Sequence, residues 1–163
     1  MTTRPSVVRW PADARPEGAP VYTYNELDVA APPDRVWAWL VRATAWPSYY
    51  GNASNVRFVE GTPPDLRLGT RFTWTTFNVK VDTTVTECVP NERLAWRGKT
   101  VGGTGYHGWV IVPTPSGCRV VTEETQRGIV PSVARWYLRR GLVTQHQRWL
   151  EGLARVAAGG LPG

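Results

Sequence analysis

One long segment near the carboxyl end, from Pro131 to Ala157, limits the folds open to this sequence. On a helix that turns about 100° per residue, its largest apolar side chains fall on one face. A helix with such a face must bury it against a broad apolar surface, and the rest of the chain has to supply that surface. The stripe consists of Leu138, Leu142, His146, Trp149, Leu153 and Val156.

The same segment carries much of the positive charge. The chain has a net charge of +6, and five arginines against one glutamate place +4 of it within residues 131–157. Clustered arginines can attract nucleic acid or anionic lipid. These arginines are scattered around the helix, so we interpret them as a solvated face that also offsets the helix dipole.

Composition indicates one globular domain. The chain has 163 residues, 42% of them hydrophobic, which is enough for a real core. Nine tryptophans are many for this length. Each of these large rings can either fill the core or line a pocket for a flat or greasy molecule, and the sequence leaves both roles open.

Two cysteines, Cys88 and Cys118, show neither metal-ligand spacing nor the pattern of a disulfide framework. No apolar run approaches the roughly 20 residues of a membrane span, and the amino end lacks the apolar core of a signal peptide. We therefore expect a cytoplasmic protein without integral membrane contact.

The chain begins with an expected loose arm over residues 1–20, which has four prolines and no sustained periodicity. Val7, Val8 and Trp10 are candidates for pinning it to the body. The alternating segment 21–30 then predicts a strand. Prolines after it favour two short helices, over residues 33–43 and 47–52.

The middle of the chain alternates apolar and polar residues between turns. Short links between the alternating segments imply antiparallel pairing, so with the first strand they predict a seven-stranded sheet. Such a sheet has one face that a long helix can cover, and a cavity between the two is expected. The six segments are 55–60, 70–77, 79–87, 91–98, 106–112 and 119–126.

This order of elements and several local motifs resemble the START/Bet v1-like (SRPBCC) superfamily, the polyketide cyclase/dehydratase and lipid-transport group. The resemblance covers residues 21–158 and leaves 159–163 as a tail. The motifs that carry it are Val29-Ala30-Ala31-Pro32 with Asp34, Val36-Trp37, Trp46-Pro47 with Tyr49-Tyr50, Tyr106-His107-Gly108-Trp109, Val120–Gly128 and Trp149–Leu153.

The resemblance implies an α+β helix-grip fold. A curved seven-stranded antiparallel sheet would wrap around the long C-terminal helix, with two short helices after the first strand and a hydrophobic pocket under the helix. Members bind lipids, sterols, hormones or polyketides, and a minority catalyse cyclisation or dehydration. Fold alone does not select among these activities.

Both histidines fall on faces that we expect to point inward. His107 and Glu124 lie on neighbouring strands and on the same face, where directly opposed Cβ atoms are about 5 Å apart. A carboxylate there would orient the imidazole for acid–base chemistry. The alternative is that Glu124 faces a wet cavity mouth while His107 packs beneath it. A one-residue slip in register would separate them.

Other chemistries have weaker support. Two histidines without a nearby cysteine or a His-x-x-x-His pair do not make three metal ligands, so we expect no metal or other cofactor. There is no Gly-x-Ser-x-Gly nucleophile motif. Gly102–Gly105 lacks the Lys-Ser/Thr ending of a phosphate loop, so we interpret residues 99–105 as a flexible turn, either mobile beside a cavity mouth or of no consequence.

Three functions follow from these observations. The first is binding of a small hydrophobic ligand, a lipid, polyketide or aromatic compound; the second is a cyclase or dehydratase that uses His107 as acid/base and Glu124 to orient it. The third, nucleic-acid binding through the basic helix, is disfavoured because the aromatic residues face inward. The oligomeric state stays open. The candidate ligand-binding residues are Phe58, Phe72, Trp74, Val81, Trp96, Trp109, Leu142 and His146.

Overall fold

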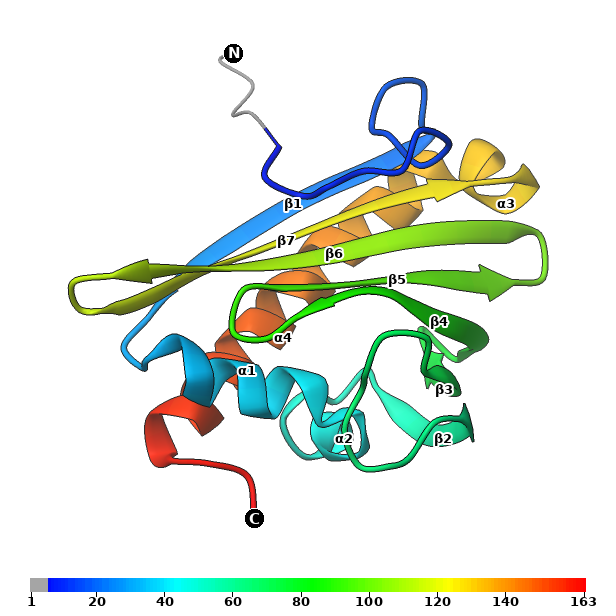
Figure 1. The fold of residues 1–163 in the computed structure, drawn as a ribbon. Coiled ribbons are helices and arrows are strands. Elements are labelled where there is room, and N and C mark those ends of the chain that lie inside the picture. The colour runs from blue at the N-terminus through cyan, green and yellow to red at the C-terminus, as the bar shows by residue number, and fades with distance from the viewer. Residues whose placement is uncertain (1–5) are drawn as a thin grey trace.

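A computed structural model describes residues 6–163 of the chain. The first five residues of the expected arm lie outside the described residues. Seven antiparallel strands form one curved sheet, with a long helix across its concave face (Figure 1). Along the sheet the strands are β1 (Val21–Val29), β7 (Gly117–Arg127), β6 (Gly103–Thr114), β5 (Arg93–Thr100), β4 (Val79–Val89), β3 (Arg71–Thr76) and β2 (Ser54–Glu60).

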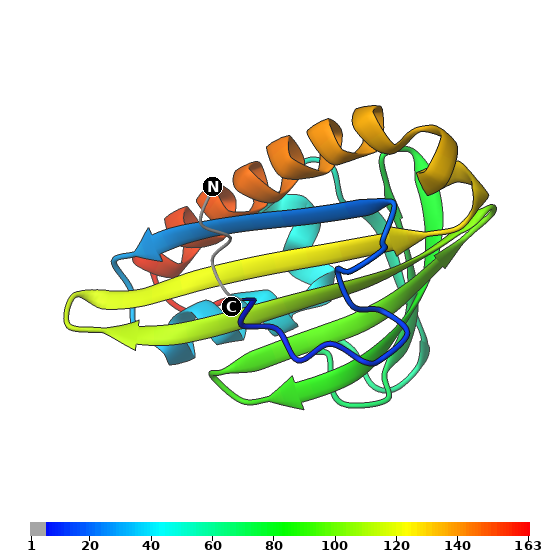
Figure 2. The same ribbon diagram turned by 90° about the horizontal axis from the view of Figure 1, so that it is seen from above.

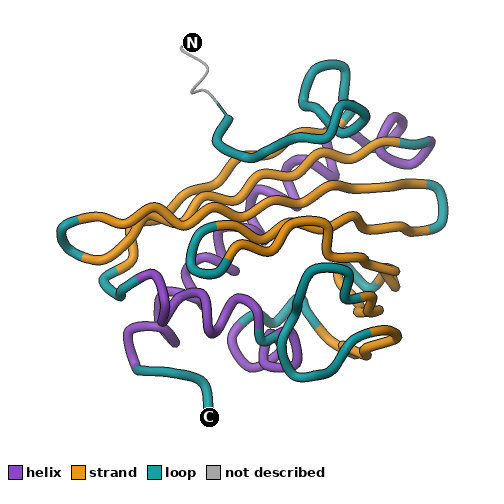
Figure 3. Tube along the Cα trace, in the orientation of Figure 1, coloured by secondary structure: helices purple, strands orange, loops and turns teal. Residues whose placement is uncertain are grey.

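Helices gather on one side of the sheet and at one end of it (Figure 3). The long helix contacts β1 most extensively and also meets the two short helices that follow β1. This arrangement is the helix-grip architecture that the sequence predicts. The helices are α1 (Pro33–Val41), the 3-10 turn η1 (Ala43–Ala45), α2 (Trp46–Tyr49), α3 (Ile129–Val133) and α4 (Arg135–Gly159).

Alternation of apolar and polar residues places every second side chain of a strand on the inner face. In β1 this puts Thr23 inside and Tyr24 outside. In the β6–β7 pair, His107 lies directly opposite Glu124, so the two share the inner face as expected and the register brings them together. Both side chains therefore point toward α4.

The C-terminal helical segment begins differently from the expectation. We predicted one helix from Pro131, but α3 ends at Val133 and α4 begins at Arg135. Ala134 between them has φ −101° and ψ 19°, outside the helical range, and this breaks the segment in two. Within α4 the inner stripe is buried at Leu142, His146, Trp149 and Leu153, whereas Leu138 and Val156 are only partly covered.

All five arginines of this segment are exposed, which agrees with their interpretation as a solvated face. Among the described residues, no helix is long and apolar enough to cross a membrane. Both cysteines are free thiols.

Aromatic rings form the centre of the main core. Trp46 of α2 and Trp149 of α4 are fully buried, with ring centroids 5.0 Å apart, and Trp74, Trp96 and Trp109 of the sheet surround Trp149. The core is therefore held by contacts between helices and sheet. Such burial of large rings is the dominant stabilising contribution in a domain of this size.

The described part of the arm packs on the opposite face of the sheet from α4 (Figure 2). The carboxylate of Glu123, which is fully buried, accepts hydrogen bonds from the Ser6 hydroxyl (2.9 Å), the Val7 amide (3.0 Å) and the Tyr22 hydroxyl (2.6 Å). Val8 is buried in a small outer cluster of apolar residues. Val8 and Trp10 thus pin residues 6–20 to the sheet, as two of the three candidates named from the sequence, while the proposed boundaries at residues 20 and 158 stay predictions.

The glycine-containing segment 99–105 is also more ordered than expected. β5 and β6 continue through most of it, pair Gly98 with Gly105 and Thr100 with Gly103, and leave Val101 and Gly102 as the turn. Gly102 has φ +84°, a conformation that favours glycine. The expected turn is therefore confined to Val101 and Gly102, because the strands pair across nearly the whole segment.

Candidate functional site

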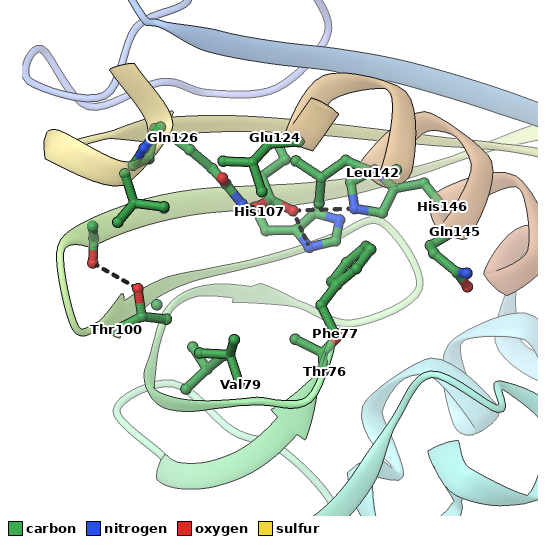
Figure 4. Close-up of a pocket in the computed structure, with 18 of the residues that line it drawn as sticks. Thr76, Phe77, Val79, Thr100, His107, Glu124, Gln126, Leu142, Gln145 and His146 are labelled. Atoms are coloured by element: carbon green, nitrogen blue, oxygen red, sulfur yellow. Dashed lines mark hydrogen bonds and ion pairs between the residues drawn. The ribbon is translucent and has the colours of Figure 1, made fainter. Parts of the chain in front are cut away.

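A cavity of about 420 Å³ lies between the inner face of the sheet and α4. Figure 4 shows its walls, with side chains from β3–β7 and α4 converging on one space. Most of the wall is apolar, and the polar groups are few. Its principal lining residues are Tyr50, Trp74, Phe77, Val81, Trp96, Thr100, His107, Glu124, Gln126, Leu142, Gln145, His146 and Trp149.

Five of the eight predicted ligand-binding residues line this cavity: Trp74, Val81, Trp96, Leu142 and His146. The other three do not. Phe72 is fully buried against Trp46 and Phe58, at centroid distances of 5.7 Å and 6.2 Å, and Phe58 packs against the same part of the core. Alternation placed Phe72 on the correct face, but the short helices after β1 cover that part of the sheet.

Trp109 is the third residue outside the walls. It lies on the inner face of β6, but it is covered by Trp149, with ring centroids 5.0 Å apart. It therefore supports the cavity from behind. Trp109 lies two residues from His107 on the same strand and therefore on the same face. This alternation could not tell us that His107 lines the cavity while Trp109 belongs to the core.

The polar centre of the cavity is a carboxylate between two imidazoles. Glu124 Oε2 lies 3.3 Å from His107 Nδ1 and 3.1 Å from His146 Nε2 (Figure 4). The side chains of His107, Glu124 and His146 are 5%, 11% and 3% exposed, so the cluster is almost completely removed from bulk water. The histidine rings stack, with centroids 4.6 Å apart.

Neighbouring side chains hold the outer atoms of this cluster. The hydroxyl of Thr122 lies 2.6 Å from His107 Nε2, and that of Thr23 lies 3.4 Å from His146 Nδ1. Gln126 Nε2 donates to Glu124 Oε1 at 2.7 Å. Each ring nitrogen thus faces a protein oxygen, and both carboxylate oxygens have partners.

Burial sets the protonation of the cluster. Removal from water lowers the pKa of His107 to about 3, although Glu124 acts in the opposite direction. Burial alone would raise the pKa of Glu124, but the two histidines and Gln126 outweigh it and hold that pKa at about 2. At neutral pH the site therefore combines a neutral His107 imidazole with an ionised carboxylate.

Comparison with known proteins agrees with this architecture. Residues 23–158 match the model of the family described as polyketide cyclase / dehydrase and lipid transport. The chain belongs to this family. Among curated proteins, none matches the chain.

Solved structures of similar fold include one group without a named activity and one group named as aromatase/cyclases. Hypothetical protein jhp0584 from Helicobacter pylori is 26% identical, with a TM-score of 0.87 and coverage of 96% of this chain and 99% of its own. The other group consists of proteins named as aromatase/cyclases. The ZhuI aromatase/cyclase from Streptomyces sp. R1128 is 15% identical, with a TM-score of 0.72 and coverage of 86% and 98%.

The di-domain aromatase/cyclase StfQ from the steffimycin biosynthetic pathway is 20% identical, with a TM-score of 0.71. The match covers 85% of this chain but 51% of StfQ, so the chain spans about half of that protein. At these identities the aromatase/cyclase structures show a shared fold. They do not transfer an activity to this family member.

Several wall residues were not singled out by sequence reasoning. Sequence patterns did mark Tyr50, in an aromatic motif after α1, and Trp149, on the apolar stripe of the helix. Neither pattern distinguished a cavity-lining residue from a core residue. Phe77 and Tyr137 had no such pattern, because both are exposed at the end of an element. Phe77 and Tyr137 line the cavity because of where α4 lies relative to the β3–β4 turn. That placement is a property of the tertiary structure.

The rim of the cavity is apolar and open to solvent. Val101 of the β5–β6 turn is 97% exposed and Tyr137 at the start of α4 is 83% exposed, and both line the cavity. Ile129, Val133 and Trp136 lie close by in sequence and are also largely exposed. A hydrophobic molecule entering here would meet apolar side chains before it reaches the polar cluster.

Proposed function

We propose that this protein binds a small hydrophobic molecule, a lipid, polyketide or aromatic compound, in the cavity between the sheet and α4. The observation that carries the proposal is the cavity itself, about 420 Å³ with mainly apolar walls and one polar cluster. Sites for small molecules have this size and this combination of many apolar and few polar groups. The exposed apolar rim supports the same interpretation.

The polar cluster would orient the ligand. A hydroxyl or carbonyl near Glu124 and His146 would find a donor or acceptor in a mainly apolar wall, whereas a purely hydrocarbon ligand would leave the cluster facing carbon. The chemistry therefore favours a ligand with an oxygen at one end or edge. Flat rings would in addition contact Trp74, Trp96 and Trp149.

Ligand binding predicts quenching of tryptophan fluorescence, because three indoles line the cavity. We expect a hydroxylated anthraquinone and a long-chain fatty acid, used as probes of the two ligand classes, to compete for one site. Leu142→Trp, which fills the cavity from α4, should weaken binding by more than about tenfold, since it removes the space that the ligand occupies.

Leu161→Trp is the matched control, because it adds the same ring at an exposed position in the tail, away from the cavity walls. It should bind both probes like the unaltered protein. Equal binding by the two variants would contradict the cavity as the ligand site. Failure of both probes to bind the unaltered protein would contradict it as well.

A second candidate function is cyclisation or dehydration of a polyketide-like substrate. The contact between His107 and Glu124 on the cavity wall favours it, because the carboxylate would stabilise the imidazolium that forms when the ring accepts the proton alpha to a carbonyl. In dehydration of a β-hydroxy ketone, His107 would return this proton to the departing hydroxyl, so that water leaves and a carbon–carbon double bond forms. Because both nitrogens of His107 face protein oxygens, the substrate would have to displace one of them.

This second candidate is tested with a synthetic poly-β-ketone thioester, whose products are followed by mass as loss of water. We expect His107→Ala and Glu124→Ala each to reduce turnover by about 100-fold or more, the usual contribution of a positioned acid or base. Glu151→Ala on the exposed face of α4 is the control. Unchanged turnover in both cluster variants would exclude this mechanism.

A further inference from the structure

Three potential ligand atoms converge at the polar cluster from three different elements, β6, β7 and α4. His107 Nδ1, Glu124 Oε2 and His146 Nε2 all lie within 4.8 Å of one another, and the two nitrogen–oxygen distances are 3.3 Å and 3.1 Å. Ligand atoms about 2.0–2.2 Å from one metal ion lie roughly 3.0–3.4 Å apart when they are neighbours. Charge-assisted hydrogen bonds are shorter, about 2.7–2.9 Å.

The outer atoms of the cluster are arranged as those of metal ligands usually are. A histidine that binds a metal through one nitrogen turns the other to a fixed partner, which orients the ring. Here the partners are the hydroxyls of Thr122 and Thr23, and Gln126 fixes the second carboxylate oxygen. All three inner atoms are thus held pointing at one another.

Thr122 fixes the outer side of His107. Its hydroxyl lies 2.6 Å from His107 Nε2 and 3.3 Å from the Gly108 carbonyl oxygen, within hydrogen-bond reach of both. Because Nε2 has this partner, Nδ1 is the ring nitrogen that faces Glu124 and His146.

We propose that His107, Glu124 and His146 bind one divalent transition-metal ion, with its open coordination positions facing the cavity. Two imidazoles and one carboxylate are a donor set typical of zinc and of iron(II) in sites that keep room for water or substrate. The two histidines alone are too few for a metal site, which is why the sequence predicts none. The fold adds Glu124 and thereby completes a set of three ligands.

A metal here would bind a ligand oxygen directly, and so would select ligands that carry a carbonyl, enol or hydroxyl. The inference goes beyond the proposed function and does not depend on it, because metal binding is measured without any hydrophobic ligand.

The test begins with the unaltered full-length protein, freed of metal by chelation. We expect Zn²⁺, Co²⁺ and, under anaerobic conditions, Fe²⁺ to bind with a stoichiometry of one ion per chain, measured by calorimetry. X-ray absorption of the zinc-loaded protein should show scattering from two imidazoles. No binding of any of the three ions, or binding without imidazole scattering, would overturn the proposal.

Variants then assign the ligands through the visible absorption of bound Co²⁺. Glu124→Gln and His146→Gln should each weaken Co²⁺ binding by about 100-fold or more, whereas the exposed control Glu151→Gln should not change it. Thr122→Val, which keeps the shape but removes the partner of His107, should weaken it by about 10–100-fold. Circular dichroism checks that each variant is folded. If a variant is not folded, the X-ray absorption of the unaltered, zinc-loaded protein decides whether two imidazoles bind the metal.

Discussion

Replacing Trp149 by alanine is expected to lower the free energy of unfolding by about 3–5 kcal/mol, the cost of removing a large buried aromatic side chain. Trp149 is 1% exposed and its ring contacts those of Trp46, Tyr50, Trp74 and Trp109, with Tyr50 stacked on it at 4.4 Å. It joins α4 to α2 and to the sheet. Urea denaturation followed by circular dichroism measures the change.

The same helix offers the matched control. Trp136 is 75% exposed, so Trp136→Ala should alter the free energy of unfolding by no more than about 0.5 kcal/mol. Equal losses of unfolding free energy in the two variants would show that any tryptophan of the helix stabilises the protein, whether or not it packs in the aromatic core. A loss below about 1 kcal/mol for Trp149→Ala would contradict the packing described above.

Two glycines of α4 should respond to alanine with opposite signs. At Gly152 an added Cβ would lie 2.1 Å from the carbonyl oxygen of Tyr49, so α2 or α4 would have to move. Because the obstacle is backbone and the site is in the core, we expect Gly152→Ala to destabilise the protein by about 2–3 kcal/mol or more.

At Gly141 the nearest atom to an added Cβ is Phe77 Cε1 at 3.5 Å, an ordinary contact. Gly141→Ala should therefore stabilise the protein by about 0.5–1 kcal/mol, the difference in helix propensity. Thermal unfolding of the two variants side by side measures both effects. A higher melting temperature for Gly152→Ala would contradict the close approach of α4 to α2, and a lower one for Gly141→Ala would contradict the open surroundings of that glycine.

Strand register was predictable for a local reason. Alternation with period two assigns each side chain of a strand to a face, and short links between strands leave only antiparallel neighbours. These two rules place His107 and Glu124 on the same face of neighbouring strands, and the ladder of the structure then pairs them directly. The inward direction of His146 followed equally from its place on the stripe of α4.

The meeting of His146 with Glu124 was not predictable in this way. Helical periodicity gives the direction of a side chain, but not where along the sheet the helix lies. That position depends on the packing of Trp149 among the aromatic rings and on the close contact at Gly152, both of which join distant segments. Spacing rules could not find this cluster for the same reason, since positions 107, 124 and 146 lie on three separate elements.

A similar limit separates the cavity walls from the core. Phe58, Phe72, Trp74 and Trp96 all lie on the inner face of the sheet, and the sequence treats them alike. Only the placement of α1 and α2 over one end of the sheet buries Phe72 and leaves Trp74 and Trp96 beside open space.

The sequence alone therefore determined the strands, their order along the chain, the inner and outer faces and the helix that covers the sheet, because short-range periodicity and turn chemistry encode these features. The tertiary structure decided where α4 lies over the sheet, which aromatic rings border the cavity, and that Glu124 lies between two histidines. Those properties arise from packing between elements far apart in the chain, and no local pattern carries that information.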